Sequence, residues 1–551
     1  MFSLHGIFEG KPDHPMFDVK EARKLLADLP KNDAFKALDE VASWLTSVKD
    51  TAGFRPEVRT EIIMLLDETG QPLHAEVLRQ YLGTPHLQDF QGLRQWQGMH
   101  GFMQALAEAY AVCLSGYQQA EKKPWDMKEN LPVICARLLR AIAERMKLEM
   151  MRYIAIEQSV WDQLFSCYSF AETSQIAESM VFAYPKQTIH TSPQRELLRS
   201  LMLYVSSPDT LAPDQIEVSY RIAGRLVSSF DFKTAPDPDC AHFIDLAKPD
   251  APGNVDGKLQ ATPTMRFFGA MKAVPKIKDI IDQNEHNLIQ REQRFGNEFT
   301  PAGKLTVLKH LQTYWGKDHP HRQQERKGIS AVINVVHDFK TISQLVTRID
   351  IDRMTSLSEK DATALKERTN IGLAAVEDIQ YSAEPWTVSD ISVDGIGGIL
   401  PKNAGAWVKI GALCGLKSQN GPLWWVGMIR RFQTDPKGVV HVGFEILAKK
   451  PLSVWLRALG KGAEKVSNWE SSSGSFEYDY LPIILLPDAQ NSYAHATMLM
   501  ESGSYAPDNI FEMMMGEKSR DIKLTGLLAE GEDYEQVSFQ WLGEGAGSRK
   551  H

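Results

Sequence analysis

The sequence WTVSDISVDGIGGILP at residues 386–401 lies in the part of the chain that decides the fold. Four similar runs surround it: GISAVINVVHDF (328–339), AWVKIGALCGL (406–416), PLWWVGMIRRF (422–432) and VVHVGFEIL (439–447). These runs are short and rich in β-branched and aromatic residues, and Gly, Pro or Asn separates most of them. Several short strands in a row, with turns between them, predict a small antiparallel barrel.

The residues before Gly316 show helical periodicity instead. In residues 33–48, apolar side chains recur every three or four positions, which places them on one face of a helix. The same pattern continues in the stretch from Leu93 and in the stretch from 130 to 170. We therefore predict a large all-α domain over residues 1–240.

Local signals mark where some of these helices begin and end. The dipeptides Ser192-Pro193 and Ala212-Pro213 are typical of the start of a helix. The sequence PLH at 72–74 is interpreted as a break between two helices, because proline lacks the amide donor that a helix interior needs. The breaks show no fixed period, which disfavours an array of helical repeats.

Changes in residue composition along the chain predict the remaining domain boundaries. Residues 241–316 are predicted to be a linker with further helices, because their first part is rich in Pro, Asp and Gly. The barrel is expected over 317–460, with a helical insertion at about 340–384. Residues 461–551 alternate again and are expected to form a small C-terminal β domain with a flexible, Gly-rich tail. The predicted fold class is multidomain α+β.

The charge balance argues against two classes of protein. The chain has 61 Lys and Arg against 70 Asp and Glu, a net charge of −9, and its pI is near 6.0. Proteins that coat nucleic acid or an anionic membrane through bulk charge are usually basic. We therefore expect no nucleic-acid binding and no membrane binding, and any phosphate site has to be local.

The cysteines and the N-terminal residues indicate the compartment. The 5 cysteines are scattered and form no CxxC motif, which is typical of reduced thiols. The first residues, MFSLHGIFEGKPDHP, lack a basic region followed by an apolar stretch. The strongest apolar run, LPIILLP at 481–487, is too short to span a bilayer. We expect a cytoplasmic protein.

Two short motifs flank the first predicted strand of the barrel. Directly before the strand stands an RxxxR motif, formed by Arg322 and Arg326. In the next strand region stands a DxSxxG motif, formed by Asp390, Ser392 and Gly395. Together with the strand VHVGFEIL, these motifs resemble the PilZ domain family of bacterial cyclic di-GMP receptors. The resemblance covers residues 317–455 and implies a PilZ-like β-barrel.

The resemblance also implies a ligand, cyclic di-GMP, and a role for each motif residue. Arginine pairs bidentately with phosphate and with the O6/N7 edge of guanine. In the family, the RxxxR arm, here Arg322 and Arg326, wraps over the ligand. The family's Asp and Ser, matched by Asp390 and Ser392, hold the guanine edge. The family's glycine, matched by Gly395, lets backbone and ligand approach closely.

Position, rather than the RxxxR motif itself, distinguishes Arg322 and Arg326. The same motif occurs at Arg55/Arg59 and, inside predicted helices, at Arg195/Arg199 and Arg221/Arg225, where we expect solvated faces. The chain also departs from the family pattern, because Asp390 comes 64 positions after Arg326. We expect this insertion to be partly helical around 358–368 and to cover the barrel or the ligand site.

Metal sites and catalytic sites have little support in the sequence. His319 and His321 lie close to Arg322, but no further metal ligand follows at a suitable spacing, so we predict no metal and no other cofactor. The motifs GxSxG, HExxH and GxxxxGK[ST] are missing. We predict that the protein is not an enzyme.

The sequence therefore predicts a cytoplasmic cyclic di-GMP receptor or effector. Ligand binding at the barrel is expected to rearrange the helical domain or to change how that domain binds a protein partner. The long insertion leaves an alternative open, a nucleotide-free PilZ-like adaptor or scaffold that acts through its helical domain. Nucleotide binding distinguishes these two hypotheses.

Overall fold

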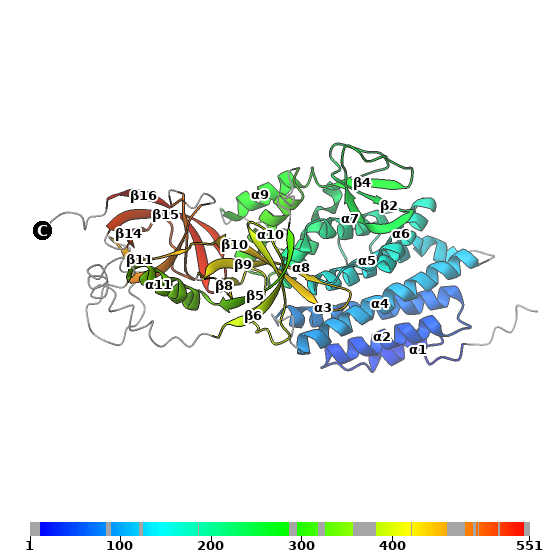
Figure 1. The fold of residues 1–551 in the computed structure, drawn as a ribbon. Coiled ribbons are helices and arrows are strands. Elements are labelled where there is room, and N and C mark those ends of the chain that lie inside the picture. Colours follow the sequence, from blue (N-terminus) through cyan, green and yellow to red (C-terminus); the bar gives the residue numbers. More distant parts are fainter. Residues whose placement is uncertain are drawn as a thin grey trace, which may run out of the picture. The chain divides into compact units, whose positions relative to one another are not determined.

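The structure is a computed structural model that describes most of the chain (Figure 1). It describes residues 12–83, 90–120, 125–185, 187–285, 295–317, 326–355, 382–419, 421, 423–459, 480–488, 492–493, 495–515 and 518–544. The chain forms two compact units. One lies within Met1–His321 and includes Gln433–Pro436, and the other lies within Arg322–Phe432 and Lys437–His551.

The first unit is mainly helical, which confirms the predicted helical region. Its α-helices are α1 (Val19–Ala27), α2 (Ala34–Asp50), α3 (Pro56–Leu82), α4 (Phe90–Gln119), α5 (Trp125–Met151), α6 (Gln158–Thr173), α7 (Pro193–Tyr204), α8 (Pro213–Leu226), α9 (Val274–Glu285) and α10 (Pro301–Tyr314). Short 3₁₀ helices cover Pro208–Thr210 and Val227–Ser229. The helix α4 packs against α2, α3 and α5 (Figure 1). No helix in the described part of the chain is long and apolar enough to cross a bilayer.

Side-chain caps begin several of these helices. Asp18, Asp33 and Ser192 accept hydrogen bonds from the backbone N–H three residues later, at 2.9, 3.0 and 3.3 Å. Such caps satisfy amide groups that have no partner inside the helix. The predicted helix starts at Pro193 and Pro213 are both confirmed.

The predicted helix break at residues 72–74 is wrong. The helix α3 contains Pro72 and continues through it. Pro72 is exposed, so water can bond to the carbonyl that lacks an amide partner. Other positions of the same helix, such as Ile63 and Leu66, are fully buried. Burial of the apolar face therefore outweighs the loss of one hydrogen bond.

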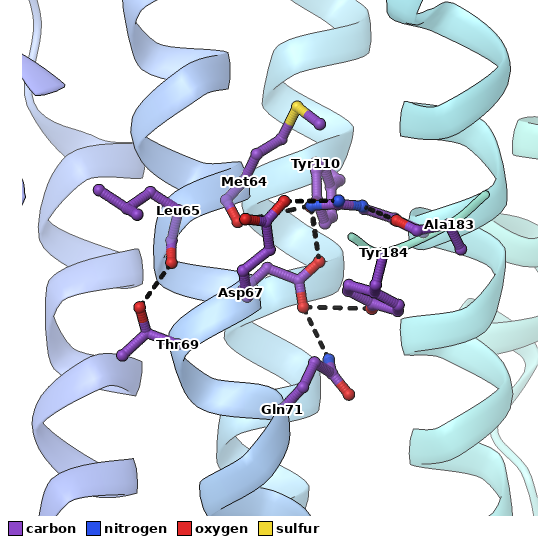
Figure 2. Close-up of polar contacts among 10 residues, drawn as sticks. Met64, Leu65, Asp67, Thr69, Gln71, Tyr110, Ala183 and Tyr184 are labelled. Atoms are coloured by element: carbon purple, nitrogen blue, oxygen red, sulfur yellow. Dashed lines mark hydrogen bonds and ion pairs between the residues drawn. The ribbon is translucent and has the colours of Figure 1, made fainter. Parts of the chain in front are cut away.

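A buried polar cluster ties three helices to the segment around Tyr184 (Figure 2). The fully buried Asp67 on α3 accepts hydrogen bonds at 2.7, 2.7 and 3.2 Å from Gln71, Tyr110 and Tyr184. Arg137 on α5 donates to Glu68 at 2.7 Å and to the backbone oxygen of Ala183. Burial raises the pKa of Asp67, although Arg137 and the hydrogen bonds oppose this effect. The cluster fixes residues 183–184 against the helical core.

A small sheet occupies part of the region that was predicted to be a linker. Its strands β1 (Asp231–Lys233), β2 (His242–Asp245), β3 (Lys248–Asn254) and β4 (Met265–Gly269) are antiparallel, in the order β1-β4-β2-β3. The Pro- and Asp-rich run forms β3, an edge strand where proline is tolerated because one side needs no donor. The linker prediction for 241–316 was therefore wrong over β2 to β4, and the further helices α9 and α10 are present.

The second unit contains two closed antiparallel barrels. The strands of the first are β5 (Lys327–His337), β6 (Glu384–Ile391), β7 (Gly395–Ile399), β8 (Leu413–Ser418), β9 (Trp425–Thr434) and β10 (Val440–Ala448), in the order β10-β7-β6-β5-β8-β9. The strands of the second are β11 (Leu452–Ala458), β12 (Tyr480–Leu486), β13 (Thr497–Glu501), β14 (Ile510–Met515), β15 (Lys518–Glu530) and β16 (Tyr534–Glu544), in the order β11-β12-β13-β16-β15-β14. The predicted fold class, a helical region followed by a β-barrel and a C-terminal β unit, is confirmed.

The second barrel begins at Leu452, earlier than the expected boundary at 461. The strand β11 pairs with β12 and β14, so it belongs to the C-terminal barrel although it follows β10 after a short connection. The Gly-rich tail from residue 545 lies outside the described residues.

One helix packs on both barrels. The helix α11 (Phe339–Thr355) follows β5 directly, at the start of the insertion expected at about 340–384, whereas the helix expected around 358–368 lies outside the described residues. Residues 356–381 lie outside the described part of the chain. A single apolar core joins buried residues from α11 with residues from both barrels, among them Ile342 and Leu345 of α11, Val426 and Met428 of the first barrel, and Leu499 and Tyr534 of the second.

Candidate ligand site on the first barrel

The DxSxxG motif spans the tight turn between β6 and β7. Asp390 lies near the end of β6, and Gly395 begins β7. The backbone N–H of Ser392 donates to the backbone oxygen of Gly395 at 2.8 Å, and the Ser392 hydroxyl lies 3.3 Å from the same oxygen. A Cβ atom on Gly395 would lie 3.3 Å from Oγ of Ser392. Glycine therefore leaves room for the hydroxyl at this turn.

A β-bulge at Ser389 turns Asp390 to the outside of the barrel. Trp386 and Val388 are buried inside it, and strict alternation would send Asp390 inside as well. The register shifts between Val388 and Asp390, so that Val388 pairs with Gly398 but Asp390 pairs with Gly397. The extra residue thus reverses the alternation. The hydroxyl of Ser389 also donates to Oδ2 of Asp390 at 3.0 Å.

Asp390 lies in a row of glycines that crosses four strands, which we call the glycine row. Gly443 on β10 pairs with Gly397 on β7, Gly397 pairs with Asp390, and Asp390 pairs with Gly328 on β5. Paired residues of antiparallel strands point to the same face. A Cβ atom on Gly397 would collide with the carboxylate of Asp390. The row is therefore flat, and the carboxylate lies close to the backbone of β7.

Arg326, directly before β5, reaches the glycine row. Its Nη1 donates to Oδ1 of Asp390 at 2.7 Å, and 31% and 26% of the two side chains are exposed. A Cβ atom on Gly443 would lie 4.0 Å from Nη2 of Arg326, so the guanidinium extends over the row. Ion pairs that reach solvent contribute only about 0–1 kcal/mol. A ligand can therefore replace this pair with little loss of stability.

The structure describes four of the five predicted site residues. It brings Arg326 into contact with Asp390, and it brings Ser392 into contact with Gly395 at the adjoining turn. Arg322 lies outside the described residues, as do His319 and His321.

Sequence reasoning missed two further arginines on this face. Arg430 on β9 donates to Glu445 on β10, which pairs with Gly395 in the register. Arg431 borders the glycine row, because a Cβ atom on Gly443 would lie 3.2 Å from Cβ of Arg431. Both arginines are exposed. Their signal in the sequence was two consecutive arginines in an otherwise apolar strand, PLWWVGMIRRF.

The face combines groups that suit a planar ligand with negative charge. Guanidinium groups pair with phosphate oxygens, and a carboxylate accepts hydrogen bonds from ring N–H groups. The glycine row lets a flat ring come close to the backbone. The arrangement is therefore suited to binding a nucleotide.

Two protein-family models match this chain. Residues 20–237 match the model described as "Cyclic-di-GMP receptor FimW, N-terminal domain", and residues 471–542 match the "FimW C-terminal beta-barrel domain". The first match spans the helices from α1 to α8, and the second spans β12 to β15 and most of β16. The first barrel, with the candidate site, lies between the two matched segments.

No curated protein matches this chain. Among the solved structures that align with it is one titled "MrkH, A novel c-di-GMP dependence transcription regulatory factor". The alignment covers 31% of this chain and 77% of that chain, with 8% sequence identity and a TM-score of 0.14. Similarity at this level supports no statement about the fold or the function of this chain.

Proposed function

We propose that this chain, which matches both the N-terminal and the C-terminal domain models of the FimW receptor family, is a receptor for cyclic di-GMP. The match of residues 20–237 to the domain of a cyclic-di-GMP receptor carries the proposal. The contact between Arg326 and Asp390 on an open barrel face supports it, because these residues belong to the two PilZ-like motifs. The protein acts in this proposal by binding rather than by catalysis.

In the proposed complex, the ligand lies on the glycine row and replaces the ion pair. Arg326 turns from Asp390 to a phosphate or to the O6/N7 edge of a guanine. Asp390 then accepts hydrogen bonds from the guanine N–H groups, and Ser392 donates its hydroxyl. Gly395 leaves space for close approach, and Arg322 adds a second guanidinium from the same arm.

The arginine arm also connects the helical region to the barrel along the chain. The helix α10 ends at Tyr314 and β5 begins at Lys327, so Arg322 and Arg326 lie in the connecting segment. A ligand that holds both arginines restricts this segment. It shifts the equilibrium between arrangements of the helical region and the barrel as far as it prefers one of them. We propose that a cytoplasmic protein partner of the helical region responds to this shift.

A nucleotide-free adaptor is the second candidate, and one observation favours it. Arg326 and Asp390 already form an ion pair, with 2.7 Å between Nη1 and Oδ1, so neither side chain requires a ligand as its partner. In this case the barrel is a scaffold, and the helical region is the surface that binds partners.

Calorimetric titration of the full-length protein with cyclic di-GMP distinguishes the two candidates. GTP and cyclic di-AMP serve as controls. Selective binding of cyclic di-GMP with micromolar or tighter affinity is the expected result. If the folded protein binds no cyclic di-GMP, the receptor proposal is wrong and the adaptor is favoured.

A further inference from the structure

Two other RxxxR pairs come together in the helical unit. One pair, Arg195 and Arg199, lies on α7, and the other, Arg221 and Arg225, lies on α8. Residues four apart share a helix face, and the two helices pack against each other. All four arginines, together with Arg140 of α5, line one cavity of about 410 Å³. The expectation that these pairs are only solvated faces was therefore wrong.

The cavity has a large excess of positive charge. Among the described residues that line it, Glu196 is the one carboxylate. Arg140 neutralises Glu196 through a bidentate pair, with Nε donating to Oε2 at 3.0 Å and Nη2 donating to Oε1. Thr191 also donates to Glu196, at 2.6 Å. The lining therefore holds five arginines against this one carboxylate.

Other parts of the fold neutralise only some of these charges. Arg221 pairs with Glu217 at 2.8 Å and with Glu298 at 2.7 Å, outside this cavity. In contrast, no carboxylate in the described residues forms an ion pair with Arg195 or Arg199. Guanidinium groups brought together without anions repel one another. The charge of the cavity therefore favours the binding of an anion.

Packing fixes Arg199 in a position suited to binding. Its Nε donates to the backbone oxygen of Tyr220 at 3.1 Å, and its Cζ lies 3.5 Å from the centre of the Tyr220 ring. A Cβ atom on Gly224 would lie 2.8 Å from Nε of Arg199, so the arginine crosses α8 at a glycine. A guanidinium that is already ordered loses little entropy when it binds phosphate.

A short hairpin forms one wall of the cavity. Val181 and Thr191 exchange two backbone hydrogen bonds of 2.8 Å, and the buried cluster at Asp67 holds Tyr184. Near the cavity, the rings of His190 and Phe182 lie 3.8 Å apart, and Phe182 is 48% exposed. Aromatic rings that reach solvent offer a nucleobase a surface for stacking.

We propose that this cavity is a second ligand site, which binds a nucleotide carrying more than one phosphate group. Its volume of about 410 Å³ lies in the range of small-molecule sites. The arginines of both helices line the same cavity, so linked phosphates can contact both pairs at once. This inference does not depend on the proposed barrel site.

The test uses calorimetry on the full-length protein in buffer without phosphate or sulfate. The probes are cyclic di-GMP, GTP and inorganic pyrophosphate. The double variant Arg195→Gln/Arg225→Gln removes two guanidinium groups from the cavity and keeps residues that favour helix. The double variant Arg326→Ala/Asp390→Ala removes the barrel site. Arg55→Gln, in an RxxxR motif whose Arg55 side chain is 65% exposed, is the matched control.

We expect at least one probe to bind the barrel variant and the Arg55→Gln control as it binds the wild type. The same probe should bind the cavity variant at least about tenfold more weakly, since each lost hydrogen bond to a charged group weakens binding by that order. Binding of cyclic di-GMP alone identifies a dinucleotide site, and binding of GTP with pyrophosphate identifies a nucleoside polyphosphate site.

The inference is overturned if no probe loses affinity in the cavity variant while that variant keeps the wild-type helix content. If cyclic di-GMP binds the wild type but not the barrel variant, the receptor proposal holds whatever the cavity does. The two proposals can therefore fail separately.

Discussion

At the residue scale, the proposed receptor site depends on the ion pair between Arg326 and Asp390. Hydrogen bonds to charged groups contribute roughly 1.5–3 kcal/mol each. We therefore expect Arg326→Ala or Asp390→Ala to weaken cyclic di-GMP binding about 10-fold to 100-fold, measured by calorimetry. Stability should change little, because both side chains are partly exposed.

Arg55→Ala is the control for these two variants. It removes an exposed arginine from an RxxxR motif in the helical region. Cyclic di-GMP should bind this variant as it binds the wild type. An equal loss of affinity in all three variants would mean that the site is placed wrongly.

At Gly397, the absence of a Cβ atom leaves space for the Asp390 carboxylate. The methyl group of Gly397→Ala collides with the Asp390 carboxylate and displaces it from the glycine row. We expect cyclic di-GMP to bind this variant about tenfold more weakly or worse, because Asp390 loses its position for the guanine edge.

The matched control for this variant is Gly257→Ala. It adds the same methyl group where no atom lies within 4 Å. Calorimetry should show unchanged affinity for Gly257→Ala. Wild-type affinity in Gly397→Ala as well would show that the position of the carboxylate on the row is not needed.

At the scale of the secondary-structure elements, we expect α11 to affect the stability of both barrels. Ile342 is 1% exposed and lies in the core shared by both barrels. Ile342→Ala leaves a cavity there and should cost about 2–5 kcal/mol. We expect scanning calorimetry to show lower thermal stability of the β unit, with both barrels unfolding in one transition.

Leu528→Ala, at a position that is 55% exposed on β15, is the control and should cost less than about 0.5 kcal/mol. If Ile342→Ala lowers the stability of only one barrel, the shared core does not couple the two.

The strand β6 shows why part of the site could be predicted and part could not. The motifs predicted that Arg326 and Asp390 act together, and the structure brings them to 2.7 Å. Alternation from Trp386 and Val388 would place Asp390 inside the barrel, however, and only the bulge at Ser389 reverses this. A bulge depends on pairing with neighbouring strands, which a single sequence does not reveal. The glycine row depends on the same pairing.

At the scale of the whole molecule, acid should destabilise the helical unit through His74. Burial lowers the pKa of His74 to about 4, although Glu144 and Glu217 oppose this effect and Lys147 adds to it. The unfolded chain therefore takes up a proton near pH 6.5, whereas the folded chain does so only near pH 4. The contribution of neutral His74 to the free energy of unfolding is therefore fully present above pH 6.5 and is lost as the pH falls toward 4. The full loss is about 3 kcal/mol.

Urea unfolding followed by circular dichroism, at several pH values across this interval, measures the effect. His74→Gln should reduce the loss of stability on acidification, since glutamine takes up no proton. The comparison uses the pH dependence alone, so a uniform loss of stability in the variant does not affect it. An unchanged pH dependence would show that His74 does not carry the effect.

The order of the domains could be predicted from the sequence, but the contacts between distant segments could not. Helical periodicity in 33–48 and the start at Ser192 agree with α2 and α7. The strand β3 was missed because its prolines lie on an edge, where they are compatible with a sheet. The sequence predicts solvated faces for the arginines of α7 and α8, since only tertiary packing brings them to one cavity.

The core that α11 shares with both barrels limits how this protein can be divided for study. A fragment that ends after β10 would lose Leu499 and Tyr534, and would expose part of the core to which Ile342 and Leu345 belong. Such an exposed apolar patch promotes aggregation. A soluble fragment that keeps the glycine row therefore has to include the C-terminal barrel, and a truncation that separates them would test solubility instead of ligand binding.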